Sequence, residues 1–183
     1  MAEEIVKPKW DGKAAAKLRG ATAEQVWPLL EDFCSFHKWL PSIDTCHQVE
    51  GVQGQPGLVR YCASTVPPSH GGNAATTLWC HEKLLAIDAA GRSLTYEVVD
   101  NNMGFKQYLS TIKLSDNNMG FKQYLSTIKL SPINGDDKPS CQMEWCFVAD
   151  PVEGWKFEDL LYYVESSLQA MAEKMVKAIQ STN

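Results

Sequence analysis

The stretch from Pro151 to Asn183 constrains the fold of this chain more than any other. After Gly154, neither glycine nor proline occurs again. Apolar residues recur there at steps of three and four, which is the period of one helical face. A helix of roughly 25 residues is about 37 Å long, so a compact domain can hold it only by wrapping around it. The apolar positions are Phe157, Leu160, Leu161, Val164, Leu168, Met171, Met175 and Ile179.

The sequence before this helix predicts mainly β-strands. Residues 10–19 alternate between small apolar and charged side chains, as in a half-buried strand. Thr22 and Gln25 have the spacing of a helix capping box, and a second short helix over Phe33–Leu40 ends before Pro41. We therefore expect residues 1–183 to form one α+β domain. Its curved antiparallel sheet of about seven strands wraps around the terminal helix, with two short helices after the first strand. The other strands are expected at 43–50, 58–65, 76–88, 93–99, 105–114 and 141–148.

Composition and charge exclude several classes of partner. The net charge is −5 and no basic patch is present, which argues against a nucleic acid or an anionic membrane surface. No apolar stretch approaches the roughly 20 residues of a membrane span. The N-terminus has no apolar run typical of a signal peptide, so we expect a cytoplasmic protein with reduced cysteines. None of the six cysteines forms a Cys-x-x-Cys pair, and we expect neither a metal nor a cofactor.

One segment is repeated letter for letter. Residues 100–115 recur as residues 116–131. Sixteen is an even number, so the inward and outward faces of a strand match between the copies. However, one additional strand would reverse the direction of everything after it. We expect one copy to enter the sheet and the other to form a loop, with loop-closure entropy favouring the first copy by only about 0.4 kcal/mol.

Strand 76–88 carries the most informative polar residue. Glu82 alternates with Leu78, Cys80 and Leu84, so an inward-facing even side would place a carboxylate in an apolar interior. Such a group must be paired or protonated. Arg60, one strand earlier, also lies on a mainly apolar side and could form a charge-assisted pair with Glu82. Two other interpretations remain: a purely structural ion pair, or a solvated face with the odd residues inside.

Aromatic residues on the later strands could line a cavity. Tyr96 and Trp145 each alternate with apolar neighbours, and Tyr108, or its duplicate Tyr124, shares a face with an isoleucine. Each residue alone is typical of plain core. As a set facing one helix, they predict a small-molecule pocket with apolar walls and a few polar tips. The candidate ligand-binding residues are Arg60, Glu82, Leu78, Tyr96, Tyr108, Tyr124, Trp145, Phe147, Leu161 and Val164.

These residues and several short motifs resemble a known superfamily. The chain is similar to the lachrymatory factor synthase-like plant branch of the birch-pollen-allergen (START-like, polyketide cyclase) superfamily, over roughly residues 9–180. The resemblance implies a helix-grip fold around a ligand cavity. The superfamily's abscisic acid receptors are a more distant resemblance, because their Ser-Gly-Leu-Pro-Ala and His-Arg-Leu motifs are missing. The matching motifs are Lys9-Trp-x-Gly-Lys13, Glu24-Gln-x-Trp27, Gly57-x-Val-Arg-Tyr61 and Glu82-Lys-Leu84.

Two functions are compatible with this resemblance. The first is a carrier or sensor of a small hydrophobic molecule, anchored at its polar end by Arg60 and Glu82. The second is a cofactor-independent isomerase that converts an alkenyl sulfenic acid to a thial S-oxide. The resemblance then implies catalytic roles for Arg60 as anchor, Glu82 as proton shuttle, and Tyr96 and Tyr108 as assisting groups. A fold alone does not decide between binding and catalysis.

Overall fold

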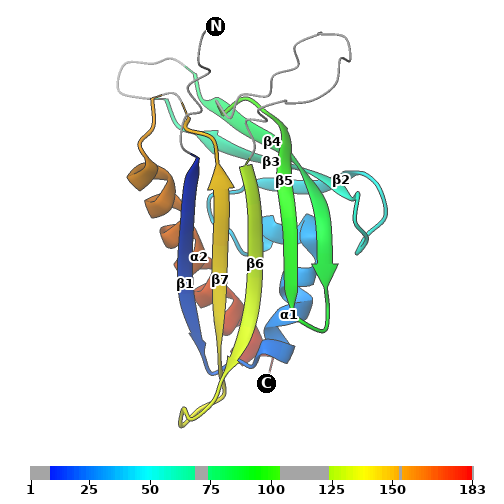
Figure 1. Ribbon diagram of the computed structural model, residues 1–183, viewed down its shortest axis with the longest axis vertical. Helices are drawn as coiled ribbons and strands as arrows, with labels where there is room; N and C mark the ends of the chain where they lie inside the picture. Colours follow the sequence, from blue (N-terminus) through cyan, green and yellow to red (C-terminus); the bar gives the residue numbers. More distant parts are fainter. Residues whose placement is uncertain (1–8, 69–73, 104–123, 153, 183) are drawn as a thin grey trace, which may run out of the picture.

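Seven antiparallel strands form one curved sheet that wraps around the long helix α2 (Phe157–Ser181) (Figure 1). This computed structural model describes residues 9–68, 74–103, 124–152 and 154–182. The predicted α+β helix-grip class is confirmed. The strands are β1 (Trp10–Arg19), β2 (Thr45–Glu50), β3 (Val59–Val66), β4 (Thr76–Asp88), β5 (Ser93–Asn101), β6 (Tyr124–Ile133) and β7 (Ser140–Ala149), in the sheet order β1-β7-β6-β5-β4-β3-β2.

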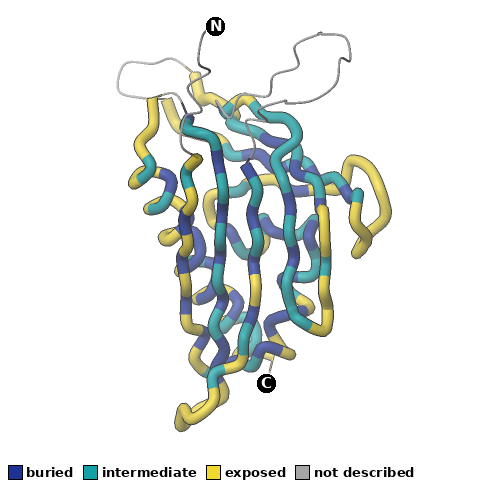
Figure 2. The backbone as a smooth tube through the Cα atoms, viewed as in Figure 1, coloured by how far each residue is buried: buried dark blue, intermediate teal, exposed yellow. Residues whose placement is uncertain are grey.

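The curl of the sheet creates an inner face. Strands β1, β5, β6 and β7 follow the long axis of the molecule, whereas β2 and β3 cross it (Figure 1). Buried and more exposed residues alternate along β1 and β7, as the period-two pattern requires (Figure 2). The buried residues of these strands point to the same side as α2 and build the core with it.

Helix α2 buries the face that its sequence predicts. Leu160, Val164, Leu168, Met171 and Met175 are all at most 3% exposed. In the first turn, the Asp159 carboxylate accepts a hydrogen bond from the backbone N–H of Lys156 at 2.8 Å, which caps the helix. The helix is also tied to the edge strand β1, because Gln169 Nε2 donates to the Ala15 carbonyl at 3.1 Å.

The two short helices follow β1 as expected. The Thr22–Gln25 capping box opens α1 (Ala23–Glu31), and both of its reciprocal hydrogen bonds are formed. The second helix is a 3₁₀ helix, η1 (Phe33–Lys38), and it is shorter than the predicted Phe33–Leu40. Phe33 and Phe36 on η1 are fully buried and point toward the sheet.

Strand β4 faces inward with its even residues, but only along part of its length. Cys80, Glu82 and Leu84 are buried. A register shift between Leu84 and Ala86 then reverses the faces, so Ala86 is exposed and Ile87 packs against the core. This β-bulge is the physical reason why strict alternation fails beyond Leu84.

The second copy of the repeat supplies β6. Tyr124–Ile133 pairs with β5 on one side and with β7 on the other. The small preference for the first copy is therefore wrong. A preference of about 0.4 kcal/mol is less than the energy of one hydrogen bond, so a single difference in local contacts outweighs it. The predicted strand 105–114 and Tyr108 lie outside the described residues.

Deleting residues 104–119 should preserve the fold. The deletion joins Met103 to Gly120 and leaves the sequence of a single copy. The connection between β5 and β6 shortens from the 22 residues 102–123 to 22 − 16 = 6 residues. We expect a gain of about 1 kcal/mol in unfolding free energy from the lower loop-closure entropy, measured by urea denaturation. A loss of several kcal/mol would contradict a dispensable copy.

Gly12 tests the packing between β1 and β7. A Cβ atom at this position would lie 2.3 Å from Cζ of Phe147, its cross-strand partner. We expect Gly12→Ala to lower the unfolding free energy by about 1–3 kcal/mol through overpacking. In a Phe147→Leu background the penalty should shrink, because the clashing ring is gone. Equal penalties in both backgrounds would show that the ring is not the cause.

Candidate functional site

A cavity of about 550 Å³ lies inside the curved sheet and is mostly lined by apolar groups. Its walls come from β3 to β7, from the segment after η1 and from the N-terminal part of α2. The side chains that the sequence predicts and that line it are Arg60, Leu78, Glu82, Tyr96, Tyr124 and Trp145. Those that it did not predict include Leu40, Ser42, Ile43, Cys62, Ser64, Thr65, Trp79, Val98, Asn102, Met103, Trp155, Leu160 and Tyr163.

Three predicted ligand-binding residues do not line the cavity. Phe147 is 1% exposed, and its ring stacks on that of Tyr124 at a centroid distance of 6.0 Å. Val164 is fully buried in the core, and Leu161 packs beside that core. Because each residue of a helix is rotated by about 100° from the last, the cavity receives Leu160 and Tyr163 from α2 instead.

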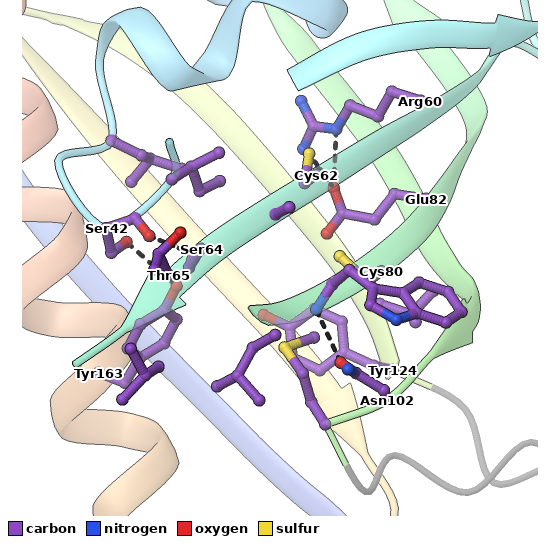
Figure 3. Close-up of a pocket in the computed structure, with 18 of the residues that line it drawn as sticks. Ser42, Arg60, Cys62, Ser64, Thr65, Cys80, Glu82, Asn102, Tyr124 and Tyr163 are labelled. Atoms are coloured by element: carbon purple, nitrogen blue, oxygen red, sulfur yellow. Dashed lines mark hydrogen bonds and ion pairs between the residues drawn. The ribbon is translucent and has the colours of Figure 1, made fainter. Parts of the chain in front are cut away.

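Arg60 and Glu82 meet inside the sheet as the alternation predicted. They are direct cross-strand partners on β3 and β4. Arg60 Nε and Nη2 donate to Oε2 of Glu82 at 2.7 and 2.6 Å (Figure 3). The exposed fractions are 1% for Arg60 and 9% for Glu82. An ion pair this deeply buried depends mainly on protein groups for its hydrogen bonds, because little water reaches it.

Helix η1 forms the surroundings of the guanidinium group. Arg60 Nη1 donates to the backbone carbonyl of Phe33. The guanidinium carbon lies 3.7 Å from the ring centroid of Phe33 and 3.9 Å from that of Phe36, which are cation–π distances. Burial is the largest single effect and acts to lower the pKa of Arg60, but the Glu82 carboxylate, together with the nearby Cys62, Cys46 and Tyr96, raises the pKa overall. The guanidinium therefore stays charged.

Three cysteines lie in a row beside this pair. Cys46, Cys62 and Cys80 are cross-strand neighbours on β2, β3 and β4, and all three are buried. Cys62 Sγ lies 3.4 Å from Sγ of Cys46 and donates to Oε2 of Glu82 at 3.8 Å. The hydrogen bond with Cys62 and burial raise the pKa of Cys46 far above its usual range. All six cysteines of the chain are free thiols. Cys46 and Cys62 are poor nucleophiles, because their raised pKa values keep them protonated.

Tyrosine and tryptophan groups line the cavity beyond Glu82. Burial raises the pKa of Tyr96 well above its usual range and also raises that of Tyr124, so both phenols are neutral. Trp145 Nε1 donates to Ser126 Oγ at 2.9 Å. Among the described residues, no group of three or more His, Cys, Asp or Glu side chains is arranged to hold a metal ion.

The lining residues missed at the sequence level follow the same periods as those found. Cys62 and Ser64 lie on the same face of β3 as Arg60, and Tyr163 lies about one helical turn after Leu160. The periodicity of the sequence was therefore enough to predict that these side chains face inward. It could not predict the position along each strand or helix at which the packed core ends and the cavity begins.

Removing one partner of the buried pair should destabilise the protein strongly. Glu82→Ala leaves the Arg60 charge buried and uncompensated, so we expect a loss of about 3–5 kcal/mol in unfolding free energy. The Arg60→Met/Glu82→Leu double variant removes both charges and should stay much closer to the wild type. Urea denaturation of the three proteins measures both effects. A loss below 1 kcal/mol for Glu82→Ala would contradict the described ion pair.

Most of the chain matches one family model and several solved structures. A family model described as polyketide cyclase/dehydrase and lipid transport matches residues 14–180. A ginseng (Panax ginseng) major latex-like protein 151 structure shares 17% identity, with coverage of 92% of this chain and 97% of that one and a TM-score of 0.61. Ara h 8.0201 shares 16% identity, with coverage of 95% and 99% and a TM-score of 0.61.

A bacterial structure has the same fold. The XoxI protein from Bacillus cereus shares 20% identity, with coverage of 94% of this chain and 96% of that chain and a TM-score of 0.61. At these identities the structures establish the helix-grip fold alone. The family match, however, spans most of the chain and includes both Arg60 and Glu82. The protein belongs to the polyketide cyclase/dehydrase and lipid transport family.

Proposed function

We propose that this protein binds a small hydrophobic molecule in its cavity and acts as a carrier or sensor. The observation that carries the proposal is the buried Arg60–Glu82 pair in the lining of a mostly apolar cavity. A volume of about 550 Å³ falls in the usual range of small-molecule sites. Apolar walls supply affinity, and a single charged pair gives the ligand one orientation.

The proposed setting is the cytoplasm. Six free thiols in one chain favour a reducing compartment. In the part of the chain that the structure describes, no helix has both the length and the apolar character needed to cross a membrane.

A second candidate function is catalysis by the same pair. The resemblance to lachrymatory factor synthase suggests an isomerase that acts on an alkenyl sulfenic acid. The S–O–H group would lose its proton and the alkenyl carbon would gain one, which yields the thial S-oxide without oxidant or cofactor. Glu82 is suited to move this proton, because its carboxylate borders an apolar cavity and is held by Arg60. The neutral phenol of Tyr96 lines the same cavity and is proposed to assist; the same role for Tyr108 rests on the resemblance alone.

Glu82→Gln distinguishes the two functions. The glutamine still accepts a hydrogen bond from Arg60 but cannot shuttle a proton. An isomerase should lose at least 100-fold in turnover of an alkenyl sulfenic acid generated in situ, which is the scale of one general acid–base group. A carrier should show no turnover with either protein and only a modest change in affinity for an apolar probe. The exposed Tyr162, changed to Phe, serves as the matched control.

A further inference from the structure

The two oxygens of the Glu82 carboxylate have different surroundings. Oε2 accepts all the hydrogen bonds recorded for this group: from Arg60 Nε at 2.7 Å, from Arg60 Nη2 at 2.6 Å and from Cys62 Sγ at 3.8 Å. In the described part of the chain, no group donates to Oε1. Figure 3 shows the second oxygen of Glu82 directed away from Arg60. Because Glu82 lines the cavity, Oε1 is the oxygen available to a ligand.

Arg60 is already occupied by the protein. Its Nε and Nη2 are bound to Glu82, and its Nη1 donates to the carbonyl of Phe33. The rings of Phe33 and Phe36 cover the guanidinium at 3.7 and 3.9 Å, and only 1% of the residue is exposed. Arg60 is thus a positioning residue, which orients the Glu82 carboxylate through two hydrogen bonds to Oε2.

Other polar groups of the lining have partners within the protein. The Asn102 side chain accepts from Trp79 N at 2.7 Å and donates to the Thr77 carbonyl at 2.8 Å. Ser64 Oγ donates to the backbone carbonyl of Ser42. Glu82 Oε1 therefore differs from these groups as a charged acceptor that the described protein groups leave open.

From this asymmetry we infer that the cavity selects apolar molecules with a terminal hydrogen-bond donor, such as a hydroxyl group, which donates to Glu82 Oε1. This inference rests on the proposed ligand-binding function and adds the chemical class of the ligand. The Glu82 side chain is 12% exposed and lines the cavity, so a ligand that fills the cavity takes water away from Oε1. A hydroxyl group on the ligand replaces the lost hydrogen bond, whereas a ligand without a donor leaves the oxygen desolvated. An ether offers no donor, and a carboxylate brings a second negative charge next to the first. A sulfenic acid, whose S–O–H is also a donor, satisfies the same requirement.

Three ligands with the same ten-carbon chain test the inference. 1-Decanol has a donor, 1-methoxydecane has only an acceptor, and decanoate is an anion at pH 7.4. Their affinities follow from displacement of the neutral fluorophore N-phenyl-1-naphthylamine. We expect decanol to bind at least tenfold more tightly than the other two, since a hydrogen bond to a charged group contributes enough for that ratio.

Two variants assign the preference to Glu82. In Glu82→Gln, the decanol preference should fall below threefold, because the amide offers both a donor and an acceptor. The Arg60→Met/Glu82→Leu variant should bind decanol and 1-methoxydecane equally, and it tests the same point if the single variant is unstable. Tyr162→Phe, at a position 72% exposed, should keep the wild-type ratios.

The outcomes separate the inference from the function on which it rests. Equal affinities for the three ligands in the wild type would overturn the donor requirement and leave the binding function standing. Tightest binding of decanoate would also overturn it and would make Arg60 the contact residue. A protein that binds neither the fluorophore nor any of the three ligands would overturn both proposals.

Discussion

The buried ion pair between Arg60 and Glu82 is the interaction on which the interior of this protein depends. A guanidinium that is 1% exposed is stable only with a charged partner and with acceptors for its remaining N–H groups. Oε2 of Glu82 and the carbonyl of Phe33 provide these contacts, and two phenylalanine rings cover the planar group. The pair therefore joins two strands and a helix beside a mostly apolar cavity, and of this pair's polar atoms only Oε1 of Glu82 stays open to that cavity within the described residues.

The fold places each part of this unit by local rules. The antiparallel register of β3 and β4 sets Arg60 directly opposite Glu82. The capping box fixes the start of α1, and the non-helical Asp32 separates α1 from η1, which carries Phe33. Helix α2 then closes the sheet from the other side, and its Leu160 and Tyr163 reach the cavity while Val164 stays in the core. Curvature of the sheet leaves space between these layers, and that space is the cavity that Glu82 borders.

Much of this arrangement follows from periodicity in the sequence. The helical face of α2, the alternation of β1 and the inward position of Glu82 were all predictable, because burial imposes fixed periods on helices and strands. The reversal of the inward face after Leu84 could not be predicted. It results from a β-bulge, and the pattern of residue types along the strand does not reveal where a bulge lies. The choice between identical repeat copies was equally hidden, because their side chains are the same and only the surrounding connections differ. The phenylalanine cover over Arg60 depends on tertiary contacts between segments distant in sequence.

A crystal structure of the protein grown with an apolar alcohol such as 1-decanol would show directly which group binds the ligand. We expect electron density for the alkyl chain along the cavity, with the hydroxyl oxygen within about 2.5–3.0 Å of Glu82 Oε1. Arg60 should keep its bonds to Oε2 and to the Phe33 carbonyl. A ligand hydroxyl bound to Arg60 instead, with the Arg60–Glu82 pair separated, would show that Glu82 Oε1 is not the contact atom.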